Sequence, residues 1–149
     1  MIKILVASRG QADLYDAAAI GEAVTLVRSF TNPDAHVHER DLVSDSAGRV
    51  YNRMGGVHQS YGQRHELRDQ ATEKFARSVA ESVAPEVHPE LCAGLLLIGS
   101  LRLINRLRDA LPAPARAKVR GVIAKNLAHL APIELQRHIC QAKRAGELG

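Results

Sequence analysis

Short apolar runs separated by turn residues open the chain. They cover residues 2–8, 12–17 and 23–31, and the last of them alternates apolar and polar side chains up to Asn32 and Pro33. Runs of this length, rich in β-branched and aliphatic residues, are typical of β-strands. Because the turns between them are short, we expect an antiparallel meander of three strands.

The hydrophobic period then changes to that of a helix. Between residues 63 and 84 an apolar side chain recurs every fourth position, and charged residues occupy the other faces. The apolar stripe consists of Leu67, Ala71, Phe75, Val79 and Val83. This spacing predicts a long amphipathic helix that ends at Pro85.

The last third of the chain alternates between strand and helix patterns. Strands are predicted at residues 93–99 and 119–124, because both are short apolar runs. Ser100 is a suitable N-cap for a helix over residues 100–111, and Pro132 opens a helix that runs to residue 145.

The order of these elements predicts an α/β fold. The last two strands follow helical crossovers, so they should lie parallel to the first strand and beside it. We therefore expect a mixed sheet of about five strands, an antiparallel meander plus two parallel strands, with flanking helices. This is the topology of ribonuclease-H-like folds, and 149 residues fit a single domain over residues 1–149.

A long polar connection, residues 33–62, separates the two patterned halves. It contains Asp41, Asp45, Arg49 and the pair Gly55-Gly56 rather than serine and glycine filler. Connections of such length without regular structure are uncommon in compact domains, and they are usually functional or disordered. This connection is therefore the first candidate location for a functional site.

Composition restricts the partners. Aromatic residues make up 3% of the chain and tryptophan is absent, which argues against base-stacking platforms. The net charge of +4 is compatible with an anionic partner without requiring one. The first apolar run is interrupted by Arg9 and is too short for a signal peptide, and the run over residues 91–98 is too short to span a membrane. We expect a cytoplasmic protein without a membrane partner.

Several segments resemble the signature of the host attachment protein family, whose bacterial members resemble the middle domain of archaeal and eukaryotic peptide-release factors. They are Phe30-Thr31-Asn32-Pro33, Arg40-Asp41-Leu42-Val43-Ser44-Asp45 and Gly48-Arg49-Val50-Tyr51, and the resemblance continues through residues 73–76, Arg102 and residues 125–130. Residues 125–128 read Lys-Asn-Leu-Ala, where the family usually has Lys-Asp-Leu-Thr. The resemblance implies an RNA- or ribosome-associated protein connected with translation.

Catalysis is not indicated. A two-metal nuclease needs several converging carboxylates, but the first strand ends in Ser8 and the fourth in Gly99-Ser100. The loop before the long helix carries Gly55, Gly56 and Gln59, but Val57 and His58 split the Gly-Gly-Gln tripeptide of release factors, and a flexible glycine loop is the alternative.

The histidines and cysteines fit no familiar site either. The spacing of His36, His38, His58 and His65 matches no zinc pattern, and solvated loop histidines explain them. The two cysteines, Cys92 and Cys140, are expected to be buried thiols. We expect no metal, no cofactor and no catalytic residue, although an enzyme is not excluded.

An anion site is the chemistry that the fold favours. Ligands collect beyond the carboxyl ends of parallel strands, where helix N-termini direct amides outward. The residues expected at that rim are Ser8, Arg9, Ser100, Arg102, Lys125 and Asn126, with Arg49 and Arg53 of the long connection placed to cover it. The alternative is that Arg102 and Lys125 pair with Asp41 or Asp45 and only hold the loop in place.

Further basic residues fall around the second helix and the fifth strand. They would form a phosphate-tracking face for structured RNA or a solvated helix face: Arg106, Arg108, Arg116, Lys118 and Arg120. The leading hypothesis is a non-catalytic RNA- or ribosome-associated module. The first alternative is a small hydrolase or an enzyme that binds a phosphate-containing small ligand. The second alternative is a protein-interaction factor that affects attachment indirectly. The sequence leaves the oligomeric state open.

Overall fold

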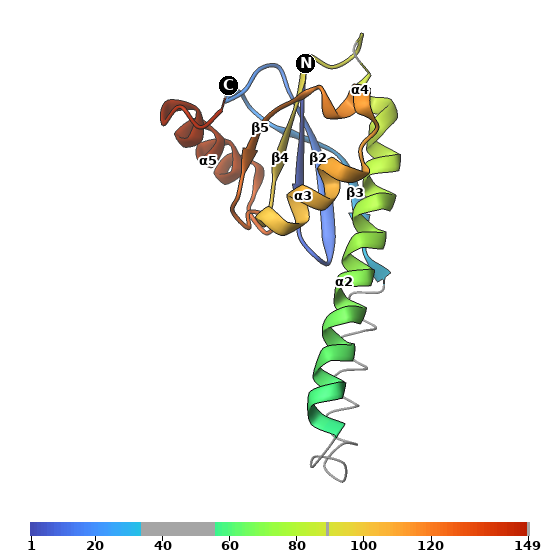
Figure 1. The fold of residues 1–149 in the computed structure, drawn as a ribbon. Helices are drawn as coiled ribbons and strands as arrows, with labels where there is room; N and C mark the ends of the chain where they lie inside the picture. Colours follow the sequence, from blue (N-terminus) through green and yellow to red (C-terminus); the bar gives the residue numbers. More distant parts are fainter. Residues whose placement is uncertain (34–55, 89, 149) are drawn as a thin grey trace.

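A mixed sheet with helices on both faces forms the body of the protein (Figure 1). The computed structural model describes residues 1–33, 56–88 and 90–148, with the backbone alone at residues 56–66 and 68. The strands are β1 (Ile2–Ala7), β2 (Gln11–Ala17), β3 (Thr25–Thr31), β4 (Gly94–Ile98) and β5 (Val119–Ile123). The helices are α2 (Gly56–Val83), the 3₁₀ turn η2 (Ala84–Val87), α3 (Leu101–Ala110), α4 (Ala113–Arg116) and α5 (Pro132–Arg144).

The five strands follow the order β3-β2-β1-β4-β5. The pairs β1–β2 and β2–β3 are antiparallel, whereas β1–β4 and β4–β5 are parallel. The predicted mixed sheet is therefore confirmed. β4 lies directly beside β1, as expected, and β5 takes the next position outward because β2 already occupies the other side of β1.

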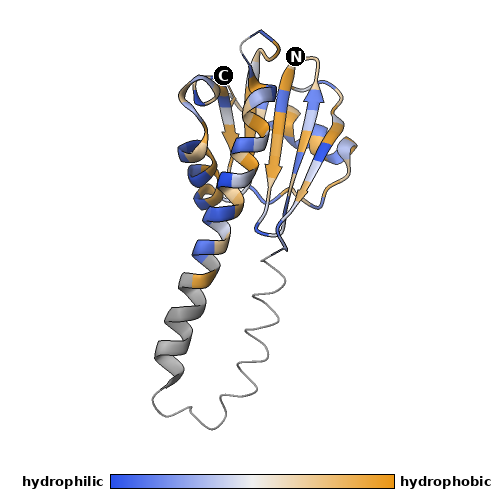
Figure 2. Ribbon diagram, turned by 90° about the vertical axis from the view of Figure 1, so that its right-hand side faces the viewer, coloured by the Kyte–Doolittle hydropathy of each residue, from blue (hydrophilic) through white to orange (hydrophobic). Residues whose placement is uncertain are grey.

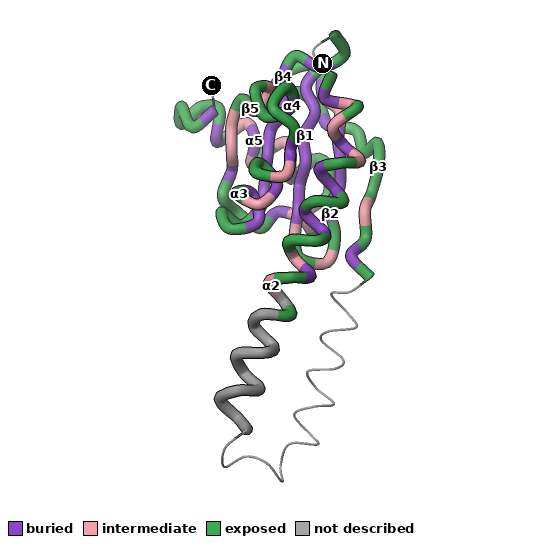
Figure 3. The backbone as a smooth tube through the Cα atoms, turned by 45° about the vertical axis from the view of Figure 1, so that its right-hand side comes forward, coloured by how far each residue is buried: buried purple, intermediate pink, exposed green. Residues whose placement is uncertain are grey.

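Two apolar cores, one on each face, hold the sheet between its helices. On one face Leu5 and Leu97 pack with Val79 of α2 and Ile104 of α3. On the other face α5 covers residues of β1, β4 and β5. β1 and β4 are buried along their whole length (Figure 3), which explains why neither strand alternates between apolar and polar residues. The one charged residue of β1, Lys3, pairs with Asp16 of β2 at 2.6 Å.

The long helix α2 begins earlier than its apolar period indicates. It starts at Gly56 rather than residue 63, so Gly56 and Gln59, which were predicted to lie in a loop, are helical. A helix that has formed adds residues at little cost, and no proline interrupts the chain between Gly56 and Pro85. The rest of the predicted connection, with Asp41, Asp45, Arg49 and Gly55, lies outside the described residues.

The apolar stripe of α2 is buried only where the helix meets the sheet. Phe75, Val79 and Val83 are buried as predicted, but Leu67 remains 45% exposed. The N-terminal half of α2 extends past the end of the sheet (Figure 1). Figure 2 shows apolar and polar residues mixed along the part of α2 that crosses the strands. The stripe thus continues beyond the surface that it packs against.

β3 is an edge strand, and its alternation does not correspond to burial. Phe30 packs against the core on the α2 side, but Leu26 on the same strand is half exposed. Arg28 of β3 binds Glu86 of η2 at 3.0 Å and donates to the Ser82 carbonyl at 3.2 Å. These contacts attach the edge strand to the end of α2.

Tyr15 is a buried titratable residue of the core, so it makes the stability of the fold depend on pH. Its side chain is 5% exposed on the α5 side of the sheet, and burial raises the pKa of Tyr15 above its ordinary value of 10.0, with a further contribution from the Asp13 carboxylate. Because the unfolded chain loses this proton first, the stability from neutral Tyr15 is complete below pH 10 and declines as the pH rises above it. Urea unfolding of the wild type should show this loss, and Tyr15→Phe should reduce the alkaline decline; an identical decline in the variant would contradict the assignment.

Candidate functional site

The carboxyl ends of β1, β4 and β5 meet at one edge of the sheet, because these strands are parallel. The chain leaves this edge through Arg9, Ser100 and Lys125-Asn126, and Arg102 follows in the first turn of α3. We call Arg9, Ser100, Arg102, Lys125 and Asn126 the strand-end edge. All five residues are exposed. Arg49, which was predicted for the same site, lies outside the described residues, and anion binding at this edge stays a prediction.

Arg9 lies in a turn whose backbone carbonyls are hydrogen-bonded to Asn32. The Arg9 carbonyl accepts a hydrogen bond from the side-chain Nδ2 of Asn32 at 2.9 Å, and the backbone N–H of Asn32 donates to the Gly10 carbonyl at 3.0 Å. Asn32 itself is buried. The turn between β1 and β2 is therefore hydrogen-bonded to the end of β3, and this fixes the backbone position of the exposed Arg9.

Ser100 is the N-cap of α3, as predicted. Its Oγ accepts a bond from the Leu103 N–H at 3.3 Å, and its own backbone is extended. The cap satisfies one of the helix's free amides, so the serine hydroxyl already has a structural role. Its O–H can still donate to an external acceptor.

Arg102 is held by an acidic residue of α2 that the sequence does not indicate as its partner. Its Nη2 lies 2.7 Å from Asp69 Oδ2 on α2, and Arg106 of α3 contacts the other carboxylate oxygen at 3.7 Å. Arg106 also donates to the Asp69 backbone carbonyl at 2.6 Å. The suggested partners of Arg102, Asp41 and Asp45, lie outside the described residues, and the described partner is Asp69.

The pairing with Asp69 changes the charge of the edge. Asp69 offsets part of the positive charge of Arg102, but the Arg102 side chain is still 58% exposed. The contact is made through one nitrogen of a guanidinium that carries five N–H donors. Arg102 can therefore accept a second anionic group beside Asp69.

The phosphate-tracking face proposed for the second helix and fifth strand is not intact. Arg116 donates to the carbonyls of Arg108, Asp109 and Leu111 at 2.9, 3.1 and 2.9 Å, and so satisfies the C-terminal carbonyls of α3. Arg106 binds the carbonyl and the carboxylate of Asp69. Arg116 has this role because the end of a helix leaves carbonyls without partners that a nearby guanidinium can bind. Arg106 instead joins α3 to α2.

A shallow groove of about 180 Å³ runs between α2 and α3. It is lined by Glu73, Arg77, Arg106, Asp109 and Ala110. Glu73 and Arg77 form an exposed pair at 3.5 Å on successive turns of α2. Because both signs of charge line the groove, it has no preference for an anion, and the strand-end edge is the better candidate.

The described residues contain no group of three or more His, Cys, Asp or Glu side chains that could hold a metal ion. Cys92 is buried, with its thiol on the Gly94 carbonyl at 2.9 Å. Cys140 is only partly buried, contrary to expectation, because it lies at the margin of α5 against Gly21. Among the helices that the structure describes, none has the length and apolar character needed to cross a membrane.

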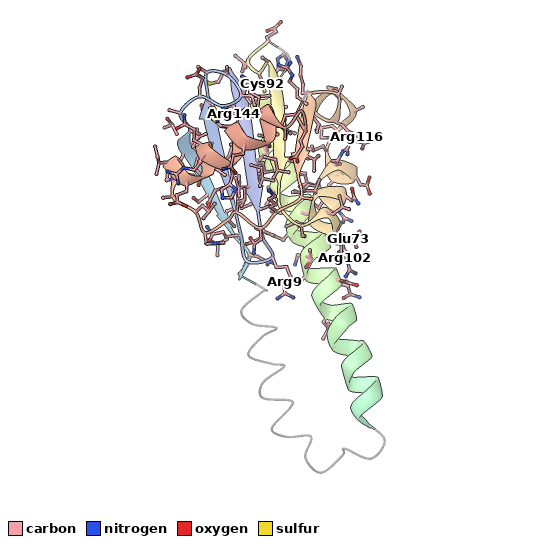
Figure 4. All side chains as sticks on the ribbon, turned by 90° about the vertical axis from the view of Figure 1, so that its left-hand side faces the viewer. Arg9, Glu73, Cys92, Arg102, Arg116 and Arg144 are labelled. Carbon is pink, nitrogen blue, oxygen red and sulfur yellow. The ribbon has the colours of Figure 1, made fainter. Side chains whose placement is uncertain are left out.

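Arg9 and Arg102 of the strand-end edge lie apart from Arg144 on α5. Figure 4 shows Arg9 and Arg102 toward the end of the sheet from which α2 extends, whereas Arg144 lies on α5 well away from them. Arg144 and its neighbour on the same helix, Arg137, are exposed. They therefore provide matched positions for comparing the effect of charge alone.

Comparison with known proteins gives a family and a group of solved structures, two of which are described below. A family model described as "Protein required for attachment to host cells" matches residues 3–139. A structure titled "Archaeal protein" covers 98% of this chain at 12% identity with a TM-score of 0.46, and the archaeal translation termination factor aRF1 covers 97% at 10% identity with a TM-score of 0.43. This chain spans 38% and 39% of their respective lengths. No curated protein matches it.

Proposed function

This chain belongs to the family of proteins required for attachment to host cells, and we propose that it acts as a non-catalytic RNA- or ribosome-associated module in the cytoplasm. In this proposal the strand-end edge binds the phosphates of structured RNA such as ribosomal or transfer RNA. The family description concerns attachment, so the RNA role rests on the residues of this chain and on the sequence resemblance described above.

One observation carries the proposal: Arg9, Arg102 and Lys125 come from separate parts of the chain and lie exposed at the same edge of the sheet. A guanidinium can bind a phosphate through paired N–H groups, and a lysine ammonium acts as a point charge. Such groups provide sequence-independent affinity for a phosphate backbone. The chain's net charge of +4 supports the same direction.

The proposal predicts salt-dependent RNA binding that depends on this edge. Anisotropy titrations of the full chain with a labelled transfer RNA, between about 50 and 200 mM salt, should give an affinity that falls linearly on a log–log scale. The double variant Arg9→Ala/Lys125→Ala should bind about tenfold more weakly, with a salt slope smaller by about two, because two phosphate contacts are lost. Both positions are exposed, so folding should be little affected.

The matched control is Arg137→Ala/Arg144→Ala, which removes the same charge from α5. It should retain wild-type affinity apart from a small long-range effect. Absence of binding at the lowest salt, or equal losses in the two double variants, would contradict the proposal. If the chain is instead an enzyme that acts on a phosphate-containing small ligand, it should turn over a small phosphate ester, and Arg102→Ala should abolish that turnover.

A further inference from the structure

The aromatic side chains that the structure describes are turned into the protein. Tyr15 and Phe75 are buried in the two cores. Phe30 is partly buried against the α2-side core, and one of its faces is covered by the Arg28 guanidinium, 4.9 Å from the ring centroid. None of these rings therefore lies open for stacking at the strand-end edge.

Stacking is how proteins usually bind single-stranded nucleic acid. Bases of a single strand are splayed out and stacked on aromatic rings or on free guanidinium planes. Arg102 is oriented by Asp69 at 2.7 Å, so its plane is not free to follow a base. The five residues of the edge thus offer hydrogen-bond donors and charge, and none of them is aromatic.

The spread of those donors suits a regular phosphate backbone. Arg9 follows β1 and Lys125 follows β5, with β4 between them. Neighbouring strands are about 4.7–4.9 Å apart, so the backbone positions from which these two side chains extend are separated by two strand spacings. Between and beside them, the Ser100 hydroxyl and the Asn126 amide are exposed neutral groups.

This mixture matches what an RNA duplex presents. The shallow minor groove of A-form RNA displays 2′-hydroxyls between two rows of phosphates, and proteins recognise it by shape and by contacts to these groups rather than by sequence. We propose that the strand-end edge binds the backbone of double-stranded RNA, with Arg9, Arg102 and Lys125 on phosphates and Asn126 on a 2′-hydroxyl. This inference rests on the proposed RNA function and names its ligand class.

The test compares nucleic acids of one length. The full chain is titrated with an RNA duplex of about 16 base pairs, a duplex of permuted sequence, an oligopyrimidine single strand and the DNA duplex. The two RNA duplexes should bind equally, and about tenfold more tightly than the single strand, whose salt slope is also shallower per phosphate. Asn126→Ala should weaken RNA-duplex binding about threefold and leave DNA-duplex binding unchanged.

The outcomes separate this inference from the broader proposal. Single-strand binding as tight as duplex binding would overturn the duplex preference while leaving RNA binding in place. Equal losses for RNA and DNA duplexes in Asn126→Ala would overturn the 2′-hydroxyl assignment. If no nucleic acid binds at low salt, both this inference and the proposed function are wrong.

Discussion

Ile104→Ala is expected to lower the free energy of unfolding by about 2–5 kcal/mol, the range typical of a large aliphatic side chain removed from a core. Ile104 is 0% exposed and belongs to the core between the sheet and helices α2 and α3. The substitution removes buried methyl and methylene groups and leaves a cavity. Around it, Leu97 of β4 and Val79 of α2 belong to regular elements that cannot easily move inward.

The measurement is chemical denaturation, with the midpoint and slope compared to the wild type. Leu101→Ala is the matched control, because Leu101 lies on the same helix, is also a large aliphatic residue and is 60% exposed. It should change stability by less than about 0.5 kcal/mol. Similar effects in the two variants would mean that α3 does not pack on the sheet through Ile104.

The strands and their pairing were predictable because burial leaves a direct trace in the sequence. β1 and β4 lie between helices on both faces, so nearly every position in them must be apolar. Two helical crossovers then require parallel neighbours, which is why the gathering of Arg9, Ser100 and Lys125 at one edge could be anticipated. The Ser100 cap was predictable for the same local reason, since its hydroxyl bonds within its own first turn.

What the sequence did not reveal depends on contacts between distant elements. The pair Arg102–Asp69 joins residues 33 positions apart, and only the packing of α3 against α2 selects Asp69 from the acidic residues of that helix. Leu67 continues the apolar stripe of α2, yet its exposure depends on where the sheet ends. Arg116 reads as a surface charge, but it satisfies carbonyls of α3.

The strand-end edge also depends on a close approach between two strands at Gly99. A Cβ atom at this position would lie 2.7 Å from the Ala7 carbonyl oxygen, and the Gly99 N–H donates to the Ile123 carbonyl at 3.1 Å. Gly99 is thus held between β1 and β5, and the atom that it would meet is backbone. Gly99→Ala must therefore separate the ends of β1 and β4, and we expect it to lower the free energy of unfolding by about 1–3 kcal/mol.

Gly10→Ala tests whether this effect belongs to the close approach or to glycine replacement in general. Gly10 lies in the turn after β1 at the same edge, a Cβ there would meet nothing within 4 Å, and its φ is not positive. Alanine should be neutral at this position or stabilise by up to about 1 kcal/mol, because it restricts the unfolded chain. Thermal unfolding of both variants should give a lower Tm for Gly99→Ala alone. Since Ser100 directly follows Gly99 and Arg102 lies in the next turn, that variant should also bind RNA more weakly when folded. Equal stability of the two variants would show that the strand ends can separate without cost.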